Sequence, residues 1–207
     1  MESMVSAAAA GFLENYQRDA SVRWSVEDLA AQRAHVNAQV AGCDWLDWST
    51  PAVALQLLQA AHAPTTLGAR DKFDSLVLAG PVVELLDPET LFEKASHPVK
   101  PGGRLVGILP CLRDNSPESR IFGELAAAVL WPYYTAEELL EWLRESDWEV
   151  DAASTGFFAV RRFNEAVLKD QLGFKGFNRI FTRLMAEGYD PMETGWGELR
   201  MVGRLKP

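Results

Sequence analysis

Residues 72–110 read KFDSLVLAGPVVELLDPETLFEKASHPVKPGGRLVGILP, and this stretch decides the fold class. It contains two short apolar runs, 76–79 and 104–109, each followed by proline, as is typical of strands that are buried on both faces. Between them, residues 89–95 have helical character, and Pro101-Gly102-Gly103 allows a tight turn into the second strand. A strand, a helix and a second strand in this order predict an α/β sheet that is largely parallel.

The alternation continues beyond residue 110. Residues 117–130 have helical character, and a further helix begins at the capping box Thr135-Ala136-Glu137-Glu138. A strand is expected at residues 148–153, two helices within 163–187, and a closing strand at 198–205. Because the closing strand follows a helical pair, it could be an antiparallel strand at the sheet edge, a common addition to such sheets.

The pattern in residues 1–70 predicts helices instead. Apolar residues at helical spacing mark residues 5–18, and a capping box at Ser25 opens a helix that Gly42 is expected to end. Ser49-Thr50-Pro51 places capping hydroxyls before a proline, which is typical of a helix start, and apolar spacing continues to residue 61. This third of the chain is therefore expected to hold three helices and at most one strand.

The order of motifs from residue 72 to 207 resembles the second half of the class I S-adenosylmethionine-dependent methyltransferases. In that family a Phe-Asp pair opens the fourth strand, an Asp-Pro pair precedes the next helix, and a Lys-Pro-Gly-Gly turn leads into the fifth strand. A tyrosine-led capping box and a last strand complete the pattern. The matching segments here are Phe73-Asp74, Asp87-Pro88-Glu89, Lys100-Pro101-Gly102-Gly103, residues 134–140 and residues 202–207.

This resemblance implies a Rossmann-like α/β sandwich with a mostly parallel sheet, formed as one methyltransferase-like domain by residues 1–207. Residues 72–207 are then the family-like core, and residues 1–70 are a shortened or atypical helical segment. The resemblance also implies that a methyl group is transferred from S-adenosylmethionine, as the one cofactor, to an O, N or C nucleophile.

Cofactor binding in this family depends on a glycine-rich loop after the first strand and on an acidic residue at the end of the second. Upstream of residue 72 the glycines are Gly11, Gly42 and Gly68, each isolated. A strand–helix–strand unit takes about 30 residues or more, so three strands with their helices do not fit before residue 72. We therefore expect a degenerate cofactor site with weak or absent catalysis, and we assign no catalytic residue.

Three residues are candidates for cofactor contacts. Gly80 and Pro81 follow the fourth strand, and α/β proteins bind ligands at the carboxyl ends of such strands. Asp44 follows residues 40–43, which form either a remnant strand or a helix end and loop. The remnant strand would place Asp44 where the family binds ribose or adenine. Asp74, at the start of the fourth strand, is expected to fix the local backbone rather than to touch the cofactor.

Composition and charge exclude several kinds of partner. With a net charge of −9 the chain lacks the basic footprint of a nucleic-acid-binding protein. No apolar stretch reaches the roughly 20 residues of a membrane helix. The two cysteines form no disulfide framework, and the three histidines lie far apart in the sequence. We expect no metal site and a cytoplasmic protein.

An alternative function is that of a non-catalytic scaffold or regulatory subunit, in effect a pseudoenzyme. The 207 residues include seven tryptophans, several of them in the N-terminal third, and tryptophan is enriched at protein interfaces. Trp45 and Trp48 could stack on an adenine, but packing or an interface contact is the more common role of such residues. We expect a homodimer or a heteromeric complex, with Trp24, Trp45 or Trp48 near the contact.

Overall fold

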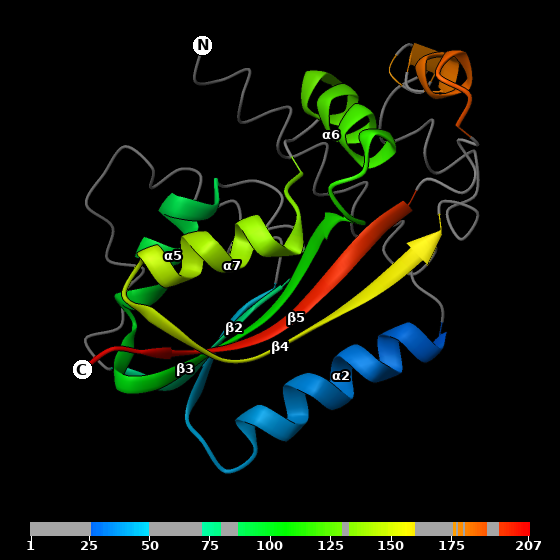
Figure 1. Ribbon diagram of the computed structural model, residues 1–207. Helices are drawn as coiled ribbons and strands as arrows, with labels where there is room; N and C mark the ends of the chain where they lie inside the picture. Colours follow the sequence, from blue (N-terminus) through cyan, green and yellow to red (C-terminus); the bar gives the residue numbers. More distant parts are fainter. Residues whose placement is uncertain are drawn as a thin grey trace, which may run out of the picture.

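The computed structural model describes residues 26–49, 72–79, 87–129, 133–159, 176, 178–179, 181–189 and 195–207. Within this part of the chain, five strands form one sheet in the order β1-β2-β3-β5-β4 (Figure 1). The strands are β1 (Trp45–Trp48), β2 (Phe73–Leu78), β3 (Val99–Leu112), β4 (Trp148–Ala159) and β5 (Gly195–Leu205). The helices labelled in Figure 1 are α2 (Val26–Val40), α5 (Pro88–Ser96), α6 (Pro117–Val129) and α7 (Ala136–Glu145).

The strand directions confirm a mostly parallel sheet. β1 pairs with β2, and β2 with β3, in parallel, whereas β5 is antiparallel to both β3 and β4. β4 therefore runs in the same direction as β1, β2 and β3. The suggested place of the closing strand at the sheet edge is wrong, because β5 lies between β3 and β4. Pairing on both sides explains why Leu199, Met201 and Val202 of β5 are all buried.

The Lys-Pro-Gly-Gly segment lies inside β3 rather than before it. Phe73 is opposite Val99, and Ser75, two residues further on, is opposite Arg104, so residues 100–103 bulge out of the ladder. Gly102 has a φ of 75°, which favours glycine. A Cβ atom on Gly103 would lie 2.8 Å from the backbone oxygen of Asp74. Both glycines are therefore needed where the chain enters this buried strand.

The N-terminal third contains a helix and a strand. The predicted helix is confirmed as α2, which ends at Val40, and Gly42 in the turn that follows has a φ of 75°. Residues 41–44 connect α2 to β1, so the structure supports the loop and not the remnant strand. The strand begins after them, at Trp45. The helices predicted at residues 5–18 and 49–61 lie outside the described residues, as does Trp24.

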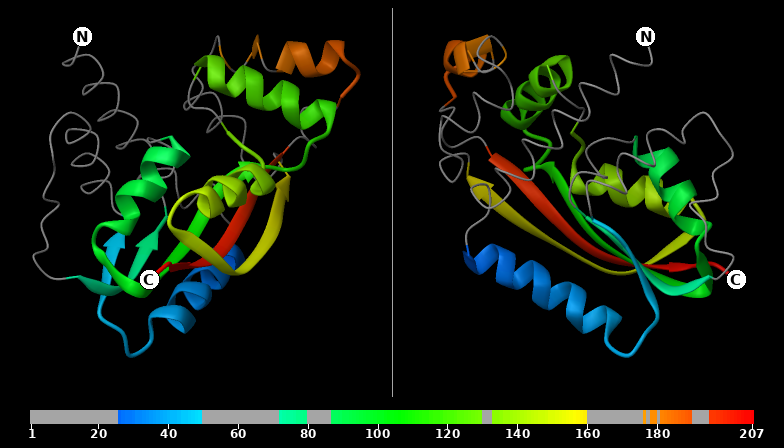
Figure 2. Two further views of the ribbon diagram at one scale, coloured as in Figure 1. Left: turned by 60° about the vertical axis from the view of Figure 1, so that its left-hand side comes forward. Right: turned by 180° about the vertical axis from the view of Figure 1, so that it is seen from behind.

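Helices cover both faces of the sheet (Figures 1 and 2). α5 and α7 pack on one face, and α2 crosses the other. The larger core cluster lies under α5 and α7, and it includes Phe92, Leu143 and Trp148. The indole N–H of Trp148 donates to the backbone oxygen of Phe92 at 3.0 Å, which ties the start of β4 to α5. The predicted capping box of α7 is confirmed: the Thr135 hydroxyl accepts a hydrogen bond from the Glu138 backbone N–H, and the Glu138 carboxylate accepts one from the Thr135 backbone N–H.

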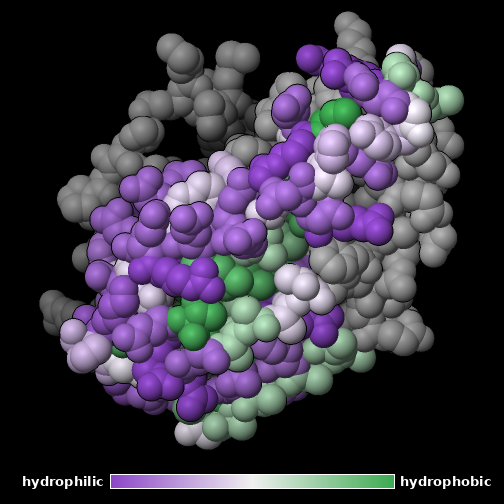
Figure 3. All heavy atoms as spheres, viewed as in Figure 1, coloured by the Kyte–Doolittle hydropathy of each residue, from purple (hydrophilic) through white to green (hydrophobic). Residues whose placement is uncertain are grey.

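The surface seen in Figure 3 is mostly hydrophilic, with a band of hydrophobic residues across its middle. Residues 151–155 of the edge strand β4 are exposed. The two tryptophans of β1 lie on opposite faces, because side chains three apart in a strand point in opposite directions. Trp48 is 3% exposed and belongs to the core, whereas Trp45 is 41% exposed.

Candidate functional site

The carboxyl ends of β1, β2 and β3 meet at one edge of the sheet, where α/β proteins bind their ligands. The described residues that follow these ends include Ser49, Ala79 and Arg113. In Figures 1 and 2, α6 and the helical residues 181–186 lie beyond the end of β3. This edge is therefore the candidate functional site.

The carboxyl end of β1 is closed by a side-chain turn. The Asp47 carboxylate oxygen Oδ1 accepts a hydrogen bond from the backbone N–H of Ser49 at 2.7 Å and another from the Ser49 hydroxyl. This is an Asx-type turn, in which an aspartate side chain takes the place of a backbone carbonyl. The Asp47 carboxylate thus stands at the end of this strand and occupies the Ser49 N–H.

The end of β3 is tied firmly to the helices that follow. The backbone N–H of Leu112 donates to the carbonyl oxygen of Tyr134 at 2.7 Å. A Cβ atom on Gly123 of α6 would lie 2.9 Å from a methyl carbon of Leu112, so α6 approaches the strand closely because this position is glycine. Arg120 of α6 donates to Glu138 at 3.1 Å, which links α6 to the capping box of α7.

An aspartate organises the loop between β3 and α6. Asp114 accepts hydrogen bonds from the Ser116 backbone N–H at 2.9 Å and from the Ser119 hydroxyl at 2.8 Å. The hydrogen bonds from Ser116, together with the contribution of Ser119, hold the pKa of Asp114 below its ordinary value. The carboxylate is thereby kept ionised as a structural acceptor.

Asp44 lies at the opposite end of the sheet from this site. It precedes β1, and its backbone oxygen accepts from the N–H groups of Asp74 at 2.8 Å and Ser75 at 3.2 Å. The Asp74 carboxylate in turn accepts from the Asp44 N–H at 3.1 Å and from the Lys100 ammonium at 2.7 Å. The Lys100 hydrogen bond and then the Asp44 hydrogen bond lower the pKa of Asp74. The expected structural role of Asp74 is confirmed.

The other two candidate residues, Gly80 and Pro81, lie outside the described residues. In the sequence they follow β2, whose last residue is Leu78. Asp44 precedes β1, which is parallel to β2, so it lies at the opposite end of the sheet from the carboxyl end of β2.

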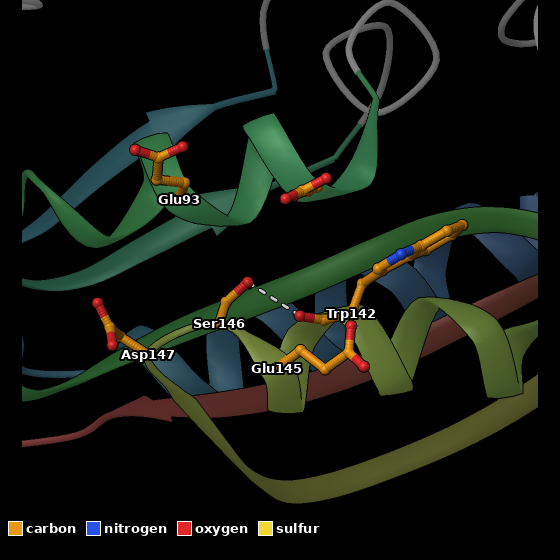
Figure 4. A pocket seen from close by; sticks show the side chains of 6 residues that line it. Glu93, Trp142, Glu145, Ser146 and Asp147 are labelled. Atoms are coloured by element: carbon orange, nitrogen blue, oxygen red, sulfur yellow. Dashed lines mark hydrogen bonds between the residues drawn. The ribbon is translucent and has the colours of Figure 1, made fainter.

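A cavity of about 370 Å³ opens between α5 and the C-terminal end of α7 (Figure 4). Its lining is acidic: Glu89, Glu93, Trp142, Glu145, Ser146 and Asp147. The Ser146 hydroxyl donates a hydrogen bond to the backbone oxygen of Trp142 at 2.9 Å, and so it caps the C-terminal end of α7. Across the described ranges, no cluster of histidine, cysteine, aspartate or glutamate could hold a metal ion. The sequence held no local signal for this cavity, because its two walls are distant in the chain.

Solved structures resemble this arrangement. A candidate methyltransferase from Bacillus halodurans aligns with a TM-score of 0.58 and 10% identity, over 87% of this chain and 100% of its own. The [4+2]-cyclase SpnF aligns with a TM-score of 0.51 and 18% identity, over 86% of this chain and 82% of its own. The fold is that of the class I methyltransferases. No protein-family model and no curated protein matches the chain.

The class I methyltransferase fold identifies the individual strands. In this doubly wound topology the first strand lies beside the fourth, so β1 takes the place of the first strand and β2 that of the fourth. Residues 49–72 connect them. A single strand–helix–strand unit takes about 30 residues, so this connection is too short for two further strands with their helices.

Fold alone does not decide the reaction. One of the two similar structures is described as a cyclase, and a fold commonly hosts several activities. In the part of the chain that the structure describes, no helix is long and apolar enough to cross a bilayer.

Proposed function

We propose that this protein is an S-adenosylmethionine-dependent methyltransferase-like protein with a degenerate cofactor site, in which catalysis is weak or absent. The observation that carries the proposal is the short connection between β1 and β2. In the methyltransferase family the second strand, which supplies the acidic residue for the ribose, belongs to that connection. Residues 49–72 are too few for the second and third strands of that fold together with their helices.

The end of β1 supports the same conclusion. Methionine or phosphate groups are bound in such folds by free backbone N–H groups and close backbone approach. Here the Ser49 N–H is already bonded to the Asp47 carboxylate and is not free to bind a ligand. We derive no catalytic step through S-adenosylmethionine.

Calorimetric titration with S-adenosylmethionine tests this proposal. We expect no heat of binding, or affinity weaker than about 1 mM, because methyl transfer depends on positioning and the cofactor must be held first. Micromolar affinity would overturn the proposal. In that case Asp47→Asn would test the carboxyl edge of the sheet, with Asp44→Ala, at the opposite end of the sheet, as the comparison.

A second candidate function is that of a scaffold or regulatory subunit, as a homodimer or with a different protein. The specific observation in its favour is Trp45, which is 41% exposed on β1, at one end of the described sheet. Exposed strand edges and aromatic side chains both favour association. The free cysteines Cys43 and Cys111 are consistent with the reducing cytoplasm that we propose as its location.

Light scattering at micromolar concentration tests the homomeric form of this second function. A mass near 46 kDa, twice that of the 23.0 kDa chain, is expected if two copies associate, and Trp45→Ser should reduce it. A monomer mass would exclude a stable homodimer. Capture from the native host with wild-type and Trp45→Ser bait would then test a heteromeric partner, and equal capture by both would contradict the role of Trp45.

A further inference from the structure

A polar cluster connects α2 to β5 beneath the sheet. The Glu198 carboxylate accepts hydrogen bonds from the side chains of Gln32 on α2 and Arg200 on β5. The Glu198 side chain is 1% exposed and that of Arg200 is 23% exposed. A buried charge is tolerated only where it is paired and hydrogen-bonded, so this contact depends on its geometry being kept.

His35 is the unsatisfied member of the cluster. It lies on α2 one turn after Gln32, and the Met201 backbone of β5 lies near its ring. Its Nε2 atom is buried and has no hydrogen-bond partner within the described residues. Burial, followed by the Arg200 charge, lowers the pKa of His35, although the Met201 contact and Glu198 act in the opposite direction.

The groups that face His35 from the sheet are few. On β5 they are Glu198 and Arg200, and the described neighbours opposite them on the adjoining strands carry no charge: Ile108 and Pro110 on β3, and Ser154 and Gly156 on β4. On α2 itself, Gln32 is neutral and Arg33 is exposed. Among the described charged groups, Arg200 and Glu198 are therefore the ones that affect the free energy of protonating the His35 ring.

The other described contacts of α2 with the sheet lie toward its C-terminal end. Val36 and Val40 contact Val77 and Val106, a small apolar cluster near the C-terminal end of the helix. Arg104 adds a hydrogen bond of 3.4 Å to the Gln39 backbone oxygen. Among the described side chains, Gln32 and His35 thus connect the middle of α2 to β5.

We propose that His35 is a pH-sensitive latch, whose neutral ring keeps the middle of α2 on β5 and whose protonation releases it. Protonation turns Nε2 into a buried N–H donor that lacks an acceptor, and it adds a positive charge beside Arg200. When α2 is detached, the ring is solvated and regains an ordinary pKa of about 6.5.

The direction of the pH effect follows from these two states. The detached state binds the proton more strongly than the attached state does. Attachment is therefore complete above about pH 6.5, and it weakens as the pH falls through the lowered pKa of the attached ring. No other side chain type titrates at its ordinary pKa between about pH 5 and 8.

Hydrogen–deuterium exchange of the α2 amides tests the latch, at about pH 7.5 and about pH 5.5 and corrected for the intrinsic pH dependence of exchange. We expect acidification to reduce the protection of residues 30–36 in the wild-type chain by roughly twofold or more. His35→Gln, which cannot be protonated, should remove this response. His97→Gln, at an exposed histidine after α5, should keep it.

Two results would overturn the proposal: an unchanged wild-type protection on acidification, or an equal loss in His35→Gln. If His35→Gln does not fold, an NMR titration of the wild-type chain decides the question. The His35 ring must then titrate below about pH 6.5, and the α2 amides must shift with the same midpoint. A His35 ring that titrates at or above that value would also contradict the latch.

Discussion

Replacing Gly103 by alanine is expected to destabilise the protein because the added methyl group has no space. The new Cβ atom would lie 2.6 Å from Cγ1 of Val99, 2.8 Å from the Asp74 backbone oxygen and 2.9 Å from the Lys100 backbone oxygen. Two of these three atoms belong to the backbone and cannot turn away. Overpacking of this kind costs about 1–3 kcal/mol. Since about 1 kcal/mol shifts Tm by 2–4 °C in a chain of this size, we expect a loss of roughly 2–12 °C.

Gly102 provides a matched comparison in the same bulge. Its φ is 75°, and a Cβ atom there would meet nothing within 4 Å. Gly102→Ala therefore costs only backbone strain, about 1–2 kcal/mol. Asparagine separates the two causes, because it tolerates the left-handed conformation but is larger than alanine. Gly102→Asn should be more stable than Gly102→Ala, whereas Gly103→Asn should be no more stable than Gly103→Ala.

Thermal unfolding followed by circular dichroism measures all four variants. The reasoning is refuted if Gly103→Ala unfolds within about 1 °C of the wild type, which is below the smallest expected shift. It is also refuted if asparagine restores stability at Gly103 as it does at Gly102. Either result would mean that the entry to β3 is not closely packed against β2.

Three further predictions concern the core and the helix ends. Burial raises the pKa of the Cys111 thiol to about 12. Iodoacetamide at about pH 8 should therefore alkylate Cys43 and leave Cys111 unmodified in the native protein. Modified Cys111 in the mass spectrum would contradict this prediction. Trp148→Phe removes the hydrogen bond to the buried Phe92 carbonyl and should cost about 1–3 kcal/mol in urea unfolding, whereas an unchanged midpoint would show that this bond contributes little. Thr135→Ala removes the cap of α7 and should cost about 1 kcal/mol, while Thr135→Ser should retain most of that stability; equal losses would contradict a capping role.

Local signals in the sequence located most elements of the fold. Residues close together in the sequence form the buried runs of β2 and β3 and the capping box of α7. Each of these features was found where it was expected. The position of β5 between β3 and β4 depends on pairing between distant segments, which no local pattern encodes. β1 was missed as a strand at Trp45–Trp48 because four residues show no clear alternation.

The candidate site was less accessible to sequence reasoning. The isolated glycines indicated a missing cofactor loop, but Asp44 was placed by analogy with a strand end, and it lies before the strand. The contact between Gln32 and Glu198 joins residues at opposite ends of the chain, and so does the contact between His35 and Met201. Contacts of this kind follow from the packing of α2 against β5, which the sequence pattern of neither element specifies.

Thermal unfolding with S-adenosylhomocysteine at about 1 mM tests the degenerate cofactor site. A ligand at 100 times its Kd stabilises the folded state by about 2.7 kcal/mol. For this chain that corresponds to a rise in Tm of about 5–11 °C. We predict no such rise, because residues 49–72 are too few for the second and third strands with their helices and the Ser49 N–H at the end of β1 is bonded to Asp47. A rise of that size would contradict the prediction and identify a working cofactor site.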